Sequence, residues 1–390
     1  MKNYTFVLMA FVIVGCSSNF KYNSIDVIEI NNSINETFDI RKNFKKTEYV
    51  ILDDSVLIAG ILDICMTKEY YYIRSLKLGG VFQFDRSGKY IRTFAMTGNG
   101  PEETSLILSV SADEEKERIY VSQLFNCLVF DFEGNLLETV PNKKGISWQR
   151  HINNDAFAEI GAEYVPYSVP EMFGIGIFSL HGDTIAIKND IFPTDVQDFN
   201  RVGFSRTFIT NSSKNNEVLC YVSSCDTIFR LTEDKISNAY AINTGNSSYK
   251  KIESIEIFDN DISEDIYDIY DFIELNNNFY LRAIRNHEMY LFSYDKTNKK
   301  TQMMKSSINL SEAISLNQKM QSVGIPNKDG GIPIWGCNIY PKEKILIQIC
   351  TYEEMCYLNE NKIINSNSSV YHNYLNNEDS NPIIILHYIK

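Results

Sequence analysis

The fold is decided by a hairpin phrase that the chain repeats. Its clearest copies read Gly80-Val81-Phe82-Gln83-Phe84-Asp85-Arg86-Ser87-Gly88-Lys89-Tyr90-Ile91 and Cys127-Leu128-Val129-Phe130-Asp131-Phe132-Glu133-Gly134-Asn135-Leu136-Leu137. In both copies an apolar strand runs into Asp-x-x-Gly and then into a second strand. The aspartate favours the start of a type I turn, and the glycine accepts positive φ at its end. Each copy therefore predicts a β-hairpin.

Looser copies of the phrase follow at 176–185, 227–236 and 290–299. The central phenylalanines of the five copies are 46, 48, 51 and 63 residues apart, counted along Phe84, Phe130, Phe178, Phe229 and Phe292. Two further strand-like runs precede each phrase, as 106–112 and 118–123 do before the second copy. Four antiparallel strands in about 46 residues is the size of a propeller blade. The sequence therefore predicts five complete blades.

A sixth blade is expected from the two ends of the chain. Strand-like runs lie at 332–340, 344–350 and 382–389, and an early strand at 25–30 or 48–52 would complete the sheet. Such closure removes the exposed edges that invite aggregation. The prediction is an all-β fold, a six-bladed β-propeller with about four strands per blade, closed by N- and C-terminal strands. A pair of β-sandwiches is the main alternative, but it would not explain one hairpin at near-constant intervals.

Composition limits the classes of function. The 390 residues are 44% hydrophobic and 22% charged, which is typical of a soluble chain with a large core. The 24 Tyr and 23 Phe favour strands over helices. The formal net charge of −13 repels phosphate backbones, so we expect no nucleic-acid partner.

The first residues predict export and a lipid anchor. Residues 4–14 form an apolar run after Lys2 that is too short to cross a bilayer as a helix and is typical of a signal-peptide core. The run ends in Ile13-Val14-Gly15-Cys16, which resembles the bacterial lipobox, whose cysteine takes the diacylglycerol. An ordinary secretory signal that contains a cysteine is the alternative. We expect a signal peptide at 1–15, a lipidated tether at 16–24 and the propeller at 25–390.

A family resemblance adds to this interpretation. The hairpin at 82–91 is followed by Gly98-Asn99-Gly100-Pro101-Glu102-Glu103, which resembles the Gly-x-Gly-Pro-Gly-Glu phrase of the six-bladed β-propeller lipoproteins of Bacteroidota, themselves similar to NHL-repeat propellers. The ending Asn381-Pro382-Ile383-Ile384-Ile385 resembles their closing strand, and Glu102 departs from the family's glycine. The resemblance implies an envelope-anchored propeller and no known reaction. With no acidic run after Cys16, we expect the periplasmic face of the outer membrane.

Cysteine usage leaves disulfides open. Seven cysteines follow Cys16, so they cannot all pair within one chain. The periplasm permits disulfides, and Cys220 with Cys225, or Cys350 with Cys356, could close a bridge across a short segment. Most of the seven lie in apolar strand-like runs, where cysteine behaves as a small buried hydrophobe. No pair has zinc-ligand spacing with a histidine nearby, so we expect no zinc site.

No common catalytic motif occurs in the sequence. Propeller ligands bind where the loops that enter the innermost strands converge on the channel. The predicted ligand-binding residues at this mouth are Glu103, Trp148, Arg150, His151, Arg206, Asp268 and Trp335, with Tyr267 beside them. Aromatic planes beside arginine and carboxylate groups suit sugars, peptides or carboxylated ligands. The alternative is that the tryptophans pack between blades and the arginines form ion pairs.

Three other segments have weaker signals. The stretch 259–271 holds six carboxylates and could bind Ca²⁺, but the EF-hand glycine and ligand order are missing, and Ser263 could cap a helical turn instead. We therefore expect no metal or cofactor, with calcium the single candidate. Residues 310–323 predict a short amphipathic helix, and 365–380 a mobile insertion in the last blade.

Two classes of function follow from these observations. The first is a non-catalytic binding module on the envelope, with a glycan, a peptide or an envelope protein as its partner. The second is a metal-dependent, lactonase- or lyase-like enzyme, which some six-bladed propellers are. The second reading requires oxygen ligands to converge on the axis, and Glu103, Asp268 and Asn338 are the candidates.

Overall fold

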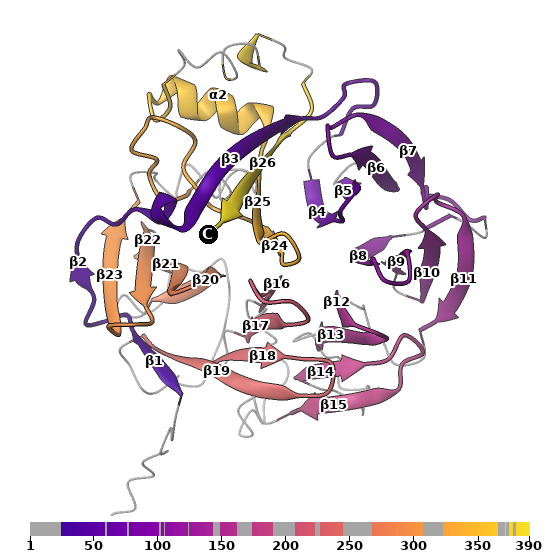
Figure 1. Ribbon diagram of the computed structural model, residues 1–390, viewed down its shortest axis with the longest axis horizontal. Coiled ribbons are helices and arrows are strands. Elements are labelled where there is room, and N and C mark those ends of the chain that lie inside the picture. Colours follow the sequence, from indigo (N-terminus) through magenta and orange to yellow (C-terminus); the bar gives the residue numbers. More distant parts are fainter. Residues whose placement is uncertain are drawn as a thin grey trace, which may run out of the picture.

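The chain forms a six-bladed β-propeller in a computed structural model (Figure 1). The structure describes residues 25–58, 61–75, 78–100, 103–104, 106–123, 125–142, 149–161, 174–189, 207–222, 227–244, 267–286, 288–306, 323–365, 371, 374–376 and 380–390. Six sheets of four or five strands surround one axis. The predicted fold class is confirmed.

Each blade runs outward from an inner strand at the axis. Blade 1 is β4 (Ile61–Met66), β5 (Tyr70–Ser75), β6 (Val81–Asp85) and β7 (Tyr90–Phe94); blade 2 is β8 (Ile107–Asp113), β9 (Arg118–Gln123), β10 (Asn126–Asp131) and β11 (Leu136–Pro141). Blade 3 is β12 (Arg150–Asn153), β13 (Ala156–Ile160), β14 (Ile175–Phe178) and β15 (Thr184–Lys188). Blade 4 is β16 (Thr207–Asn211), β17 (Val218–Val222), β18 (Thr227–Leu231) and β19 (Ile236–Asn243). Blade 5 is β20 (Asp268–Leu275), β21 (Asn278–Arg285), β22 (Glu288–Asp295) and β23 (Lys300–Lys305); blade 6 is β24 (Asn338–Tyr340), β25 (Ile345–Cys350), β26 (Ile383–Ile389) and β3 (Phe44–Ile51).

The repeated phrase forms the outer hairpin of blades 1 to 5, as predicted. In blade 1, Gly88 has a φ of 92°, and the Asp85 carboxylate accepts hydrogen bonds from the backbone NH groups of Ser87 and Lys89. The pairing register shifts at the central phenylalanine in blades 1 to 4, which marks a β-bulge there. The turn chemistry of the phrase thus produces both the turn and the bulge beside it.

The central phenylalanine of each phrase packs against the preceding blade. Phe84 lies in a buried cluster with blade 6 residues such as Ile345, and Phe130 lies in another with Phe94 of blade 1. The third, fourth and fifth phenylalanines likewise join buried clusters with blades 2, 3 and 4. Burial of one such side chain contributes roughly 2–3 kcal/mol. The period seen in the sequence is therefore the period of inter-blade contacts.

Blade 6 closes the ring with strands from both ends of the chain. β26 pairs with β25 on one side and with β3 on the other, from Ile383 opposite Ile51 to Ile389 opposite Phe44. The closing strand is thus the later of the two predicted candidates. The earlier one, β1 (Asp26–Glu29), instead adds a parallel fifth strand to blade 4, and β2 (Ile34–Asn35) does the same for blade 5. A 3-10 turn at Ile40–Asn43 then leads into β3.

The connection between β25 and β26 contains a helix that the strand pattern did not predict, α2 (Tyr352–Glu360). Thr351 and Glu354 form a capping box at its start. Tyr371 and Tyr374, from the segment expected to be mobile, are buried against this helix. Cys350 and Cys356 are unpaired thiols. Cys225 and all but the last residue of the predicted helix at 310–323 lie outside the described residues. Among the residues described, no helix combines the length and apolar character that a membrane crossing requires.

Candidate functional site: a polar cavity on the propeller axis

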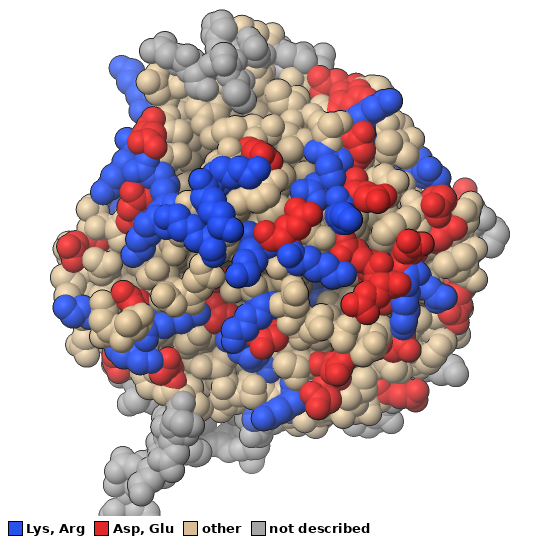
Figure 2. All heavy atoms as spheres, viewed as in Figure 1, with Lys and Arg blue, Asp and Glu red and all other residues tan. Residues whose placement is uncertain are grey.

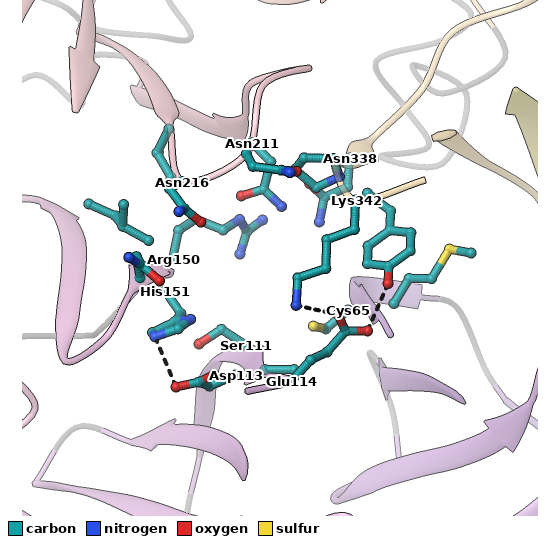
Figure 3. Close-up of a pocket in the computed structure, with 18 of the residues that line it drawn as sticks. Cys65, Ser111, Asp113, Glu114, Arg150, His151, Asn211, Asn216, Asn338 and Lys342 are labelled. Atoms are coloured by element: carbon teal, nitrogen blue, oxygen red, sulfur yellow. Dashed lines mark hydrogen bonds and ion pairs between the residues drawn. The ribbon is translucent and has the colours of Figure 1, made fainter. Parts of the chain in front are cut away.

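A cavity of about 120 Å³ lies among the inner strands of blades 1, 2, 3, 4 and 6 (Figure 3). Its walls come from the ends of β4, β8, β12, β16 and β24 and from the turns that follow three of them. The lining residues of this axial cavity are Cys65, Met66 and those at 110–115, 150–153, 211, 215–218, 338 and 340–342. Segments from five blades thus meet in one space, because the inner strands all surround the axis (Figure 1).

Two buried polar groups of β8 line the cavity without a hydrogen-bond partner. Ser111 and Asp113 are each 5% exposed, and neither Ser111 Oγ nor Asp113 Oδ2 makes a hydrogen bond. The two residues lie on the same face of β8 because side chains alternate along a strand. An unsatisfied buried polar group costs about 1–3 kcal/mol, so such groups are rare without a functional reason. These atoms are the strongest indication that the cavity receives a ligand.

Arg150 on β12 forms a two-pronged ion pair with Asp63 on β4. Nη1 lies 3.2 Å from Oδ2 and Nη2 lies 3.3 Å from Oδ1, and both side chains are mostly buried. The pair connects blades 3 and 1, and Asp63 also accepts a hydrogen bond from the Val110 backbone between them. The guanidinium charge is thereby neutralised, and the Nε atom is the Arg150 donor that remains unpartnered.

The His151 side chain is buried against the rings of Tyr120 and Phe157, which also contact each other. Its Nε2 lies 3.0 Å from the Asn154 backbone oxygen and 3.6 Å from Asp113 Oδ2. Burial lowers the pKa of His151, so the ring is neutral at pH 7. Ser111, Asp113 and His151 are the residue types of a catalytic triad, but the Ser111 hydroxyl makes no hydrogen bond to the imidazole. The contact between nucleophile and base that a hydrolase needs is therefore missing.

The opposite wall of the cavity ties blade 6 to blade 2. Lys342 Nζ lies 2.8 Å from Glu114 Oε2, and the Tyr340 hydroxyl donates to Glu114 Oε1 at 2.7 Å. Asn338 donates to the Ile64 backbone oxygen, which links blade 6 to blade 1 as well. The Asn216 amide points into the cavity from the turn after β16 (Figure 3). The wall thus offers an ammonium, a carboxylate and an amide to a ligand.

Of the residues predicted for the channel mouth, the structure brings Arg150 and His151 into the axial cavity. Glu103 accepts a hydrogen bond from the Gly100 backbone NH at 2.8 Å and so closes its own turn. Asp268 is the first residue of β20 and pairs with Ile284. Neither carboxylate lines the cavity, and Trp148 and Arg206 lie outside the described residues.

Trp335 lies inside the protein, with 4% of its surface exposed. Its indole NH donates to Asp271 Oδ2 at 3.2 Å, and the Arg282 guanidinium lies 4.6 Å from its ring centre. Arg282 and Asp271 form a buried ion pair at the same place. Tyr267 is also buried, with its hydroxyl against Met303. This is the packing arrangement that the sequence left open as the alternative for the tryptophans.

The three predicted metal-ligand candidates are not brought together. Asn338 lines the axial cavity, whereas Glu103 and Asp268 do not. Within the described ranges, no group of three or more His, Cys, Asp and Glu could hold a metal ion. Most of the acidic stretch, 259–266, falls outside those ranges.

In the wall of the axial cavity, burial raises the pKa of the Cys65 thiol to about 12, so the thiol is protonated at neutral pH.

The sequence analysis missed Ser111, Asp113, Asn216 and Lys342. All four lie at the end of an inner strand or in the turn after it, whereas the prediction searched the loops before the inner strands. The available signal was polar residues at the end of the first strand of a blade or in the turn after it, as in Asp113-Glu114-Glu115 and Asn215-Asn216-Glu217.

The family described as "Domain of unknown function (DUF4934)" matches residues 24–388. Among solved structures, a "Putative exported protein" from Bacteroides fragilis is 17% identical with a TM-score of 0.66, over 93% of this chain and 99% of that one. A DUF4221 member from Bacteroides vulgatus is 10% identical with a TM-score of 0.49, over 89% of this chain and 97% of that one. No curated protein matches the chain. The first of these similarities supports the propeller fold.

Proposed function

The chain belongs to the DUF4934 family, and we propose that it is a lipid-anchored binding module of the cell envelope whose ligand occupies the axial cavity. The observation that carries the proposal is a pair of buried atoms that make no hydrogen bond, Ser111 Oγ and Asp113 Oδ2, in a space built by five blades. The description of the Bacteroides fragilis structure as exported supports an envelope location. The lipobox-like segment before Cys16 supports the anchor.

The polar atoms of the axial cavity that make no hydrogen bond favour a hydroxyl-bearing ligand such as a saccharide. A hydroxyl can donate to the Asp113 carboxylate and accept from the Asn216 amide or Arg150 Nε, so one ligand can satisfy groups of both kinds. A buried water occupies roughly 10–15 Å³ of such a volume, so the 120 Å³ of the cavity holds about as many heavy atoms as one sugar ring. Rigid inner strands from five blades keep the groups in place, which reduces the cost of ordering on binding.

A non-catalytic role is the better proposal on this geometry. Catalysis by acyl or glycosyl transfer needs an activated nucleophile or two carboxyl groups that flank the reacting bond. In the cavity, the Ser111 hydroxyl has no contact with His151, and Glu114 is engaged by Lys342 and Tyr340. Asp113 Oδ2 is the buried carboxylate oxygen of the cavity that makes no hydrogen bond, and His151 Nε2 lies 3.6 Å from it.

The anchor is tested by replacing Cys16 with alanine in cells fed labelled palmitate. Wild type should incorporate the label and fractionate with the outer membrane, and Cys16→Ala should lose both properties. The matched control is Cys356→Ala, which removes a thiol from α2 and should keep the label. Full incorporation in the Cys16→Ala variant would show that the lipid is attached elsewhere.

Ligand binding is tested by screening the purified protein against a glycan array and a peptide library. We expect saccharide hits whose affinity falls about tenfold to a hundredfold in Asp113→Asn, since a hydrogen bond to a charged group contributes about 1.5–3 kcal/mol. Asp183→Asn, in the exposed outer turn of blade 3, is the control and should bind as wild type does. Hits confined to peptides, or equal affinity in both variants, would contradict the proposal.

A further inference from the structure

A second hollow adjoins the axial cavity and is lined by four lysines. It has a volume of about 260 Å³ and shares Asn215, Pro341 and Lys342 with the axial cavity. Its ammonium groups come from three blades: Lys214 of blade 4, Lys296 of blade 5, and Lys342 and Lys344 of blade 6. We refer to these four lysines and the space between them as the lysine groove.

Two of the four lysines have carboxylate partners and two have none. Lys296 Nζ lies 2.8 Å from Glu274 Oε1, and Lys342 Nζ lies 2.8 Å from Glu114 Oε2. The Lys214 and Lys344 side chains make no hydrogen bond or ion pair within the described part of the chain. The lysine groove therefore carries two positive charges that no carboxylate among the described residues neutralises.

The one carboxylate that lines the groove cannot neutralise them. Glu274 is 3% exposed, and its oxygens already accept from the Arg230 guanidinium at 3.0 Å and the Tyr240 hydroxyl at 2.6 Å, besides Lys296. Its charge is thus shared between two cations beneath the groove. Burial lowers the pKa of Lys296, and the positive charges of Arg230 and Lys214 lower it further against the attraction of Glu274. Lys214 and Lys296 are therefore close enough to repel one another.

Such crowding is unusual in a chain whose acidic residues outnumber its basic ones by 50 to 37. Figure 2 shows the two charges unevenly distributed on the face in view: Lys and Arg are most concentrated at the centre and toward blades 5 and 6, and Asp and Glu over blades 1 and 2. Like charges held together in a concave surface raise the local concentration of anions. An anion that bridges the lysines would remove the repulsion.

We infer that the lysine groove is an anion subsite for a carboxylate, sulfate or phosphate group on a small soluble ligand. Ammonium groups on flexible stems suit this role, because each offers three donors that can turn toward an oxyanion. A concave site between three blades fits a compact group better than it fits a flat membrane surface. If the proposed function holds, the same ligand extends from the axial cavity into the groove through their shared wall. The subsite itself rests on its own residues and does not require that function.

The test is a sulfate titration of the full protein with ¹³C-methylated lysines, followed by NMR at constant ionic strength. The Lys214 and Lys344 signals should shift saturably, and Lys214→Gln should weaken sulfate binding about three- to fivefold, the size of one exposed charge contact. Lys344→Asn should do the same, with asparagine chosen because Lys344 has a φ of 54°. Lys235→Gln, in the outer hairpin of blade 4, is the matched control and should bind as wild type does.

Two outcomes would overturn the inference. One is a shift that rises linearly and equally for Lys214, Lys344 and Lys235, which would show general ionic screening. The other is binding to phosphatidylglycerol vesicles that Lys214→Gln abolishes and sulfate does not inhibit, which would identify a membrane contact. Asp113→Asn should leave sulfate binding intact, so loss of saccharide binding in that variant counts only on the proposed function.

Discussion

Replacing Glu274 with glutamine should reveal how much one buried carboxylate contributes to the contact between blades 4 and 5. Glu274 lies on β20 of blade 5 and accepts hydrogen bonds from Arg230, Tyr240 and Ser212 of blade 4. Lys296 completes the cluster from its own blade. The substitution keeps the shape of the side chain and removes the charge. It therefore leaves Lys296 without its carboxylate partner and Arg230 with Glu217 as its remaining one.

The magnitude follows from the pKa of the carboxyl group. Burial alone would raise the pKa of Glu274, but Lys296 and Arg230 outweigh it and lower the pKa from 4.5 to about 2. This difference corresponds to about 3 kcal/mol of stability at neutral pH. The stabilisation is complete above pH 4.5 and is lost as the pH falls toward 2, because the unfolded chain binds the proton first. About 2 kcal/mol of it should be gone at pH 3.

The assay is urea denaturation of wild type and Glu274→Gln at pH 7 and pH 3, followed by circular dichroism. The variant should be less stable by about 3 kcal/mol at pH 7 and by about 1 kcal/mol at pH 3. All other titrating groups are present in both proteins, so the change in the difference reports Glu274. Glu133→Gln, in the exposed outer turn of blade 2, controls for the loss of a charge. A difference that is the same at both pH values would refute the electrostatic reasoning.

Three further predictions concern the closure of the ring and its blades. Burial lowers the pKa of His387 from 6.5 to about 3, so stability should fall by about 1.4 kcal/mol per pH unit below 6.5 on its account, and His387→Gln should reduce that slope in chemical denaturation at several pH values. Gly88→Ala should lower the melting temperature, because Gly88 has a φ of 92° and a Cβ there would lie 2.3 Å from the Ile51 backbone oxygen. Gly100→Ala is its control, because the atoms nearest to its added Cβ belong to the Glu103 side chain, at 3.2 Å or more. Deletion of 382–390 removes β26, the partner of both β25 and β3, and should yield insoluble protein on expression.

Only part of the candidate site could be predicted from the sequence. Arg150 and His151 were predicted and do line the axial cavity. They begin β12, which has four residues, so all of this inner strand lies along the cavity. Ser111 and Asp113 were not singled out, because their importance lies in the partners that they lack. Whether a buried hydroxyl or carboxylate is satisfied depends on side chains from four other blades. No local pattern contains that information.

The fold itself follows from short-range sequence patterns that can be recognised without the structure. Turn-forming residues, alternating apolar positions and one large phenylalanine per blade are near-neighbour patterns, and they sufficed for the number of blades and the five hairpins. The choice between 25–30 and 48–52 as the closing strand was different. Both runs are strand-like, and only the tertiary structure shows that the second pairs with β26 while the first joins blade 4. Strand partners are selected by register and packing between segments hundreds of residues apart, so the sequence determined the blades and the assembled ring decided how they close and which polar groups face the axis.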